Sequence, residues 1–166
     1  MTISQVLRRI YVRPPEPIPP EHRRLLLLVG AAMLIGGYDA NIYGMAIPQI
    51  QKSLNIADAD VGRIIFLFRL GMIPAIALSY LADRVGRRGL LMATLAGATV
   101  ATIWTAFAQS VTEFVAAQTL ARVCIYTEEL LCVVVIAEEF NERTRGWAIG
   151  QLAALASLGA GLAALA

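Results

Sequence analysis

The sequence has little charge and a single histidine. Charged residues make up 16% of the 166 residues, whereas apolar residues make up 58%. A soluble domain is typically about a quarter charged. The charges also lie between long apolar runs, which indicates an integral membrane protein. His22 lies in a polar stretch near the amino terminus, so we expect neither a metal site nor a cofactor.

Cysteine is also scarce. Cys124 and Cys132 are eight residues apart in one apolar run. On a helix this spacing corresponds to about 12 Å of rise, which is too far for a disulfide bond. The two cysteines are therefore predicted to pack as small side chains. The sequence also lacks a nucleophile–base pair, a phosphate loop and a metal cluster, so we predict no enzyme activity and no nucleic-acid partner.

The apolar runs predict five membrane-spanning helices. A helix needs roughly 20 apolar residues to cross the hydrocarbon layer, and its backbone polar groups are satisfied internally. The predicted transmembrane domain is 25–166, with spans at 25–47, 61–81, 90–107, 114–137 and 147–166. We expect Pro48 to end the first span. Residues 1–24 form a basic, proline-rich tail, in which 3–12 are predicted to form a short amphipathic helix.

The distribution of lysine and arginine predicts the orientation. One side of the predicted membrane domain collects Arg8, Arg9, Arg13, Arg23, Arg24, Arg84, Arg87, Arg88, Arg143 and Arg145. The other side has only Lys52 and Arg63. Cytoplasmic loops carry the excess of positive charge, so we expect a cytoplasmic amino terminus in a plasma (inner) membrane.

Several charged residues fall within the predicted spans, namely Asp39, Arg69, Arg122, Glu128 and Glu129. A charge at the bilayer centre costs at least ~2.5–3.5 kcal/mol, so such residues face protein or water and are functional candidates. Their positions along the spans place Asp39, Arg69 and Arg122 in one layer, slightly outside the midplane. Glu128 and Glu129 lie slightly to the cytoplasmic side of this layer.

We predict that these charges line a polar cavity for a solute and a proton. The predicted pathway comprises Asp39, Asn41, Arg69, Arg122, Tyr126 and Glu129. Helical spacing places Arg122, Tyr126 and Glu129 on one face of the fourth span. An arginine would attract an anionic group, and Asp39 or Glu129 would exchange a proton. The alternative is a structural ion pair, for example Asp39 with Arg69.

Glycines surround the polar residues of the first span. Gly36, Gly37 and Gly44 flank Asp39 and Asn41. The favoured interpretation is that these glycines bend the helix and bring its backbone close to the cavity. The alternative is close packing of the first span against another helix.

The short polar segment between the second and third spans resembles a loop signature of the major facilitator superfamily, G-x-L-A-D-R-x-G-R-R. The matching residues are Leu81, Ala82, Asp83, Arg84, Gly86, Arg87 and Arg88, and Ser79 stands at the first glycine. The resemblance implies an all-α membrane protein whose five transmembrane helices are the N-terminal portion of a twelve-helix fold. It also implies that the charged residues of the loop form part of a cytoplasmic latch between two six-helix halves.

The first span is similar to that of proton-coupled symporters for sugars and organic acids in this superfamily, through Gly37-Tyr-Asp39 and Ala46-Ile-Pro48. Arg122 resembles the arginine of the family's fourth helix, which is associated with proton transfer. The resemblance therefore implies a secondary transporter that moves a small organic metabolite with protons by alternating access, and the arginines predicted at the depth of the cavity favour an anionic metabolite. The alternatives are a drug:proton antiporter and a non-transporting membrane subunit or scaffold.

The predicted partners are the lipid bilayer, the solute, the proton and the missing C-terminal helices of the same protein. Five spans leave a three-helix repeat incomplete. The last span carries small residues, which favour close packing against a neighbouring helix. We therefore expect the chain to be the front part of a larger protein, with a natural short product as the alternative.

Overall fold

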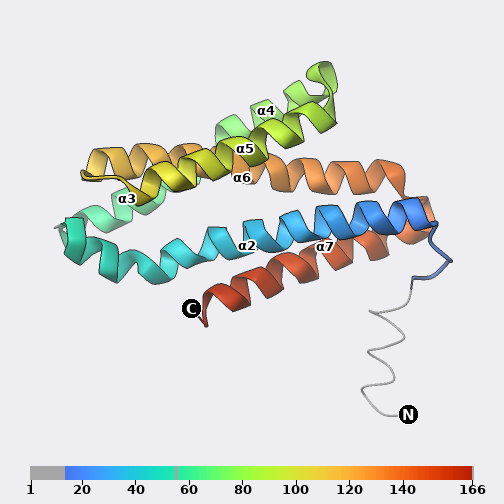
Figure 1. Cartoon of the computed structure of the whole chain (residues 1–166), viewed down its shortest axis with the longest axis horizontal. Coiled ribbons are helices and arrows are strands. Elements are labelled where there is room, and N and C mark those ends of the chain that lie inside the picture. Colours follow the sequence, from blue (N-terminus) through green and yellow to red (C-terminus); the bar gives the residue numbers. More distant parts are fainter. Residues whose placement is uncertain (1–13, 55, 166) are drawn as a thin grey trace, which may run out of the picture.

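The computed structural model describes residues 14–54 and 56–165 as a bundle of α-helices (Figure 1). The helices are α2 (Pro20–Leu54), α3 (Asp58–Leu70), α4 (Met72–Val85), α5 (Arg87–Ala106), α6 (Val111–Glu139) and α7 (Glu142–Ala163). No strand occurs in these two ranges. The helix predicted at 3–12 lies outside the described residues. Because α3 and α4 run end to end, the bundle consists of five helical segments, as the sequence predicts.

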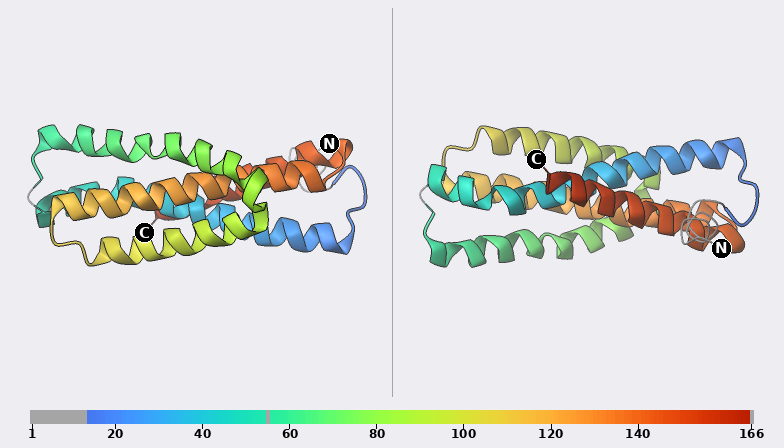
Figure 2. Two further views of the ribbon diagram at one scale, coloured as in Figure 1. Left: turned by 90° about the horizontal axis from the view of Figure 1, so that it is seen from above. Right: turned by 90° about the horizontal axis from the view of Figure 1, so that it is seen from below.

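Four of these segments are long and apolar enough to cross a membrane: Pro20–Ser53, Asp58–Val85, Arg87–Ala106 and Glu142–Ala163. The exception is α6, which carries Arg122, Glu128 and Glu129 in its interior. This helix contacts each of the other described helices. Figure 2 shows it between the α3–α4 segment and α5, with α2 and α7 on a further side. A central helix is shielded by its neighbours, and it can therefore carry charges that a lipid-facing helix cannot.

A close approach of backbones brings α2 and α7 together. A Cβ atom added at Gly37 would lie 2.2 Å from the carbonyl oxygen of Ala156. A Cβ atom added at Gly159 would lie 2.0 Å from the carbonyl oxygen of Leu34. Glycine is therefore required at both positions, because it lets helices approach closely. Close packing, rather than a bend around a cavity, explains Gly37.

Two prolines affect the helices differently. Pro48 lies inside α2, which continues to Leu54, so the prediction that the first helix ends at Pro48 is wrong. A proline removes one backbone hydrogen bond, and a long helix that is held by its neighbours can absorb that loss with a local bend. Pro74 lies in the first turn of α4, where it has no N–H to donate to Leu70. This loss accounts for the break between α3 and α4 at Gly71.

The remaining connections follow local chemistry. Gly86 joins α4 to α5 with φ of 99°, a conformation that disfavours residues with a side chain. Ser110 caps α6 by accepting a hydrogen bond from the Glu113 N–H at 3.2 Å. Asn141 caps α7 by accepting one from the Thr144 N–H at 2.9 Å. Such caps satisfy N–H groups that a helix leaves unpaired at its start.

The apolar core lies between α2, α6 and α7. It consists of Val29, Met33, Cys132, Ile136, Phe140, Ala148 and Leu152. Cys132 is fully buried there, Cys124 is half-buried, and both are free thiols. The prediction that they pack as small side chains is therefore confirmed for Cys132. Many large apolar side chains elsewhere are exposed, for example Leu27 at 73% and Phe107 at 75%, as expected for a surface that contacts lipid.

Candidate functional site

The charged centre of the bundle is Arg122 on α6. Its side chain is only 5% exposed. Its Cζ atom lies 5.6 Å from the centre of the Tyr43 ring on α2, within the range of a cation–π contact. A Cβ atom added at Gly71 would lie 3.3 Å from the Cβ of Arg122, so the break between α3 and α4 packs directly against this arginine. Three helical segments therefore enclose it.

Two carboxylates lie near this arginine without pairing with it. The charge of Arg122 acts electrostatically on both Asp39 of α2 and Glu129 of α6. Glu129 is oriented toward α2, because its Oε1 would lie 3.6 Å from a Cβ atom added at Gly36. The three ion pairs of the described residues, defined by N···O distances of up to 4.0 Å, include none of these groups. In the described fold, one arginine and two carboxylates thus lie near one another without forming an ion pair.

The other predicted pathway residues are placed differently. Arg69 on α3 is exposed and forms no ion pair with Asp39 in the described part of the chain. Asn41 is also exposed, and its side-chain amide donates a hydrogen bond to the Gly37 carbonyl oxygen of its own helix at 2.9 Å. Tyr126 is half-buried one helical turn from Arg122. The structure therefore brings Arg122, Asp39 and Glu129 together and leaves Arg69 apart.

Two polar residues of this centre were missed from the sequence. Tyr43 stacks on Arg122 as described above. Gln118 is fully buried, and its Nε2 donates a hydrogen bond to the Thr105 hydroxyl at 3.0 Å. Each lies one helical turn from a predicted residue, Tyr43 after Asp39 and Gln118 before Arg122. That i±4 spacing is the signal that could have found them.

Buried Glu128 lies on a different side of α6. It is 7% exposed and forms no ion pair with the described residues. Cys124, one turn earlier on α6, faces α5, because a Cβ atom added at Gly97 would lie 3.0 Å from its sulfur. Glu129 instead faces α2. Because consecutive residues of a helix point in different directions, the two adjacent glutamates lie on different sides of α6.

The predicted loop signature forms an ion-pair cluster at one end of the bundle. Arg87 pairs with Asp83 at 2.9 Å and also with Glu138 at the end of α6. Arg84 and Arg88 are exposed and form no ion pair with the described residues. The cluster ties the α4–α5 turn to α6. Of the remaining signature residues, Leu81 is exposed, Ala82 is buried and Gly86 makes the turn.

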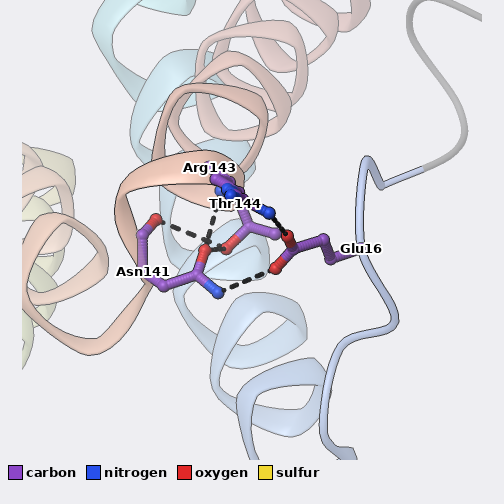
Figure 3. Close-up of polar contacts among 4 residues, drawn as sticks. All are labelled: Glu16, Asn141, Arg143 and Thr144. Carbon is purple, nitrogen blue, oxygen red and sulfur yellow. Dashed lines mark hydrogen bonds and ion pairs between the residues drawn. The ribbon is translucent and has the colours of Figure 1, made fainter.

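The same end of the bundle has a second polar cluster (Figure 3). Glu16, in the extended segment before α2, accepts hydrogen bonds from the Asn141 side chain at 3.2 Å and from Arg143 at 2.9 Å. These contacts join the chain before α2 to the first turn of α7. Over residues 14–54 and 56–165, no group of three or more His, Cys, Asp or Glu side chains could hold a metal ion.

The fold and these clusters define an α-helical membrane protein with a charged centre inside its bundle. The family model of the Major Facilitator Superfamily matches residues 29–166. The chain therefore belongs to this superfamily, and the five helical segments are the N-terminal portion of its fold. No solved structure matches significantly.

Several curated proteins are similar over most of the chain. The "Putative metabolite transport protein YaaU" of Escherichia coli (strain K12) is 28% identical over 84% of this chain and 32% of its own length. The "Triacylglyceride transporter" of Mycobacteroides abscessus is 28% identical over 89% of this chain and 30% of its own length. The "Synaptic vesicle glycoprotein 2A" of Rattus norvegicus is 27% identical over 80% of this chain and 19% of its own length. The chain thus spans about a third or less of the length of these relatives.

Proposed function

We propose that this chain forms the first part of a secondary active transporter that moves a small organic anion together with protons. Membership of the superfamily and the transport names of two relatives support the general role. In this proposal residues 1–24 are a cytoplasmic tail and 25–166 are an incomplete six-helix half. Alternating access then requires the remaining helices of a twelve-helix protein, which rock against this half.

The observation that carries the proposal is that Arg122 is buried without an ion-pairing partner among the described residues. It is buried at 5% exposure, and no described carboxylate lies within ion-pairing distance. A buried charge is costly unless it is paired, so an anionic solute that reached this arginine would gain a desolvated partner. The polar neighbours Tyr43 and Gln118 would add hydrogen bonds to a bound solute.

Proton coupling follows from the two nearby carboxylates. The positive charge of Arg122 acts on Asp39 and Glu129. A solute anion that pairs with Arg122 changes the field at both carboxylates, and their affinity for protons changes with it. Solute binding and proton exchange are thereby linked through one arginine. Arg69 and Asn41 are exposed, and in this proposal they meet the solute pathway only once the other half is in place.

The ends of the bundle support an orientation with a cytoplasmic amino terminus in a plasma membrane. Arg84, Arg87 and Arg88 lie at one turn, and Arg143 and Arg145 lie at the start of α7. Among the described residues at the opposite turn, between α2 and α3, the basic ones are Lys52 and Arg63. The positive excess favours the first end as the cytoplasmic one. In this orientation the charged residues of the α4–α5 turn would contact the second half at the cytoplasmic side. These residues are Asp83, Arg84, Arg87 and Arg88.

The experiment measures proton flux into liposomes that hold a pH-sensitive dye and contain the complete twelve-helix protein of which this chain, in the proposal, is the first part. Monocarboxylates, dicarboxylates, neutral sugars and cationic drugs are added in turn. We expect one class of anion to drive proton entry, and we expect Arg122→Gln and Asp39→Asn to abolish it without loss of expression. The control is Arg63→Gln, which removes an exposed arginine outside the centre.

Each other outcome favours a different function. Normal anion-driven flux in Asp39→Asn removes Asp39 from the mechanism. Proton release that is driven only by cationic drugs identifies an antiporter. The absence of flux with every solute favours a non-transporting subunit or scaffold, for which the exposed small residues Gly150, Ala153 and Ala154 of α7 offer a helix-packing face.

A further inference from the structure

A pocket lies at the end of the bundle where α2 begins. Its lining includes Pro17, Ile18, Arg23, Leu26, Leu27 and Trp147; it is partly open to the outside and has a volume of about 470 Å³. The wall before α2 is held in place by Glu16, which bonds to Asn141 and Arg143 of the α7 start (Figure 3). Neither the pocket nor its residues belong to the Arg122 centre.

The two polar side chains of the residues that line this pocket, Arg23 and Trp147, are both hydrogen-bond donors. Arg23 is exposed and forms no ion pair with the described residues. The indole N–H of Trp147 is buried and has no acceptor within the described ranges. Arg143 is already neutralised by Glu16 at 2.9 Å. A buried N–H without an acceptor costs free energy, so a ligand that displaces the side chains covering this N–H and brings an acceptor to it, beside the Arg23 cation, would suit this pocket.

The apolar groups lie further along α2. Leu26 and Leu27 follow Arg23 by three and four residues, which corresponds to about 5 Å of helix rise. Leu27 and Leu28 are each 73% exposed, so the apolar side of the pocket continues onto the outer surface of the helix. From the end of the bundle inward along α2, the cationic Arg23 therefore comes first and the apolar surface of Leu26 and Leu27 follows. An anionic lipid has the same order, with its phosphate outermost and its acyl chain deeper.

We infer that this pocket binds an anionic phospholipid, with its phosphate on Arg23 and the Trp147 N–H and its acyl chain along Leu26 and Leu27. Basic pockets beside transmembrane helices suit lipid head groups. A free phosphate would use the same two donors but would leave the apolar walls unused, and the lipid is therefore the favoured source. The bound lipid would bridge α2 and α7 next to the Glu16 contacts.

Native mass spectrometry of the detergent-purified protein tests this inference, with equal amounts of phosphatidylglycerol and phosphatidylcholine added. We expect preferential retention of phosphatidylglycerol. Arg23→Gln is expected to weaken retention about fivefold, which is the effect of one basic residue near a membrane surface. Trp147→Phe keeps an aromatic side chain, although a smaller one, and removes the donor; it is expected to weaken retention about tenfold. The matched control is Arg24→Gln, because Arg24 is also exposed, at the next position of α2, and does not line the pocket.

Three results would overturn the inference. Equal retention of the two lipids would show no recognition of the anionic head group. Equal losses in Arg23→Gln and Arg24→Gln would show a general charge effect rather than a site. Displacement of the lipid by excess inorganic phosphate would show that the site takes a free anion. Because Arg23 is exposed, its variant is expected to fold even if Trp147→Phe does not.

Discussion

The contact between Gly159 of α7 and the α2 backbone leads to a prediction with a definite sign. In Gly159→Ala, the new Cβ atom would lie 2.0 Å from the Leu34 carbonyl oxygen and 2.9 Å from the Tyr38 nitrogen. Real Cβ atoms essentially never approach other heavy atoms more closely than 3.0 Å, so α7 has to move away from α2. Both obstacles are backbone atoms, which cannot rotate aside as a side chain does.

Two effects of this substitution oppose each other. Overpacking of a close contact costs about 1–3 kcal/mol. Alanine in place of glycine inside a helix gains about 0.5–1 kcal/mol. We therefore expect Gly159→Ala to lower the free energy of unfolding by about 1–2 kcal/mol. In the control, Gly150→Ala, nothing lies within 4 Å of the added Cβ, so only the gain remains and the variant is expected to be neutral or more stable.

The assay heats the purified protein in mild detergent and measures the fraction that stays monodisperse in size-exclusion chromatography. We expect a midpoint several degrees lower for Gly159→Ala than for the unmodified protein, and an unchanged or higher midpoint for Gly150→Ala. The same midpoint for both variants would refute the reasoning, because it would mean that α2 and α7 do not meet at this glycine.

Three further predictions concern the ends of the bundle. Asp83→Asn weakens the exposed ion pair with Arg87, so it is expected to cost under about 1 kcal/mol of stability. It is nevertheless expected to slow transport turnover in the complete protein more than it weakens solute binding. An unchanged turnover rate would exclude a latch role. Asn141→Ala removes the cap of α7 and is expected to lower stability by about 1 kcal/mol in thermal unfolding, whereas an unaltered midpoint would contradict the capping contact. Asp58→Cys is expected to react with an impermeant thiol reagent from outside intact cells, whereas protection there with labelling of Arg88→Cys would reverse the proposed orientation.

The sequence by itself determined where the helices lie. Long apolar runs can satisfy their backbone only as helices in lipid, so run length predicts the five helical segments. Charges inside such runs are costly and therefore identified Asp39, Arg122 and Glu129 as candidates. The positions of helix ends were less predictable, because α2 absorbs Pro48 and Pro74 divides the second segment.

Only the tertiary structure decided which of these charges meet. Arg69 and Arg122 look alike in sequence, since both are arginines at similar depths in apolar runs. Periodicity places each residue on a face of its own helix, but it does not say which neighbour that face meets. The packing of α6 at the centre buries Arg122 against Tyr43 and leaves Arg69 exposed on α3. Contacts between helices, which no single helix encodes, therefore separate the buried charged centre from the arginine outside it.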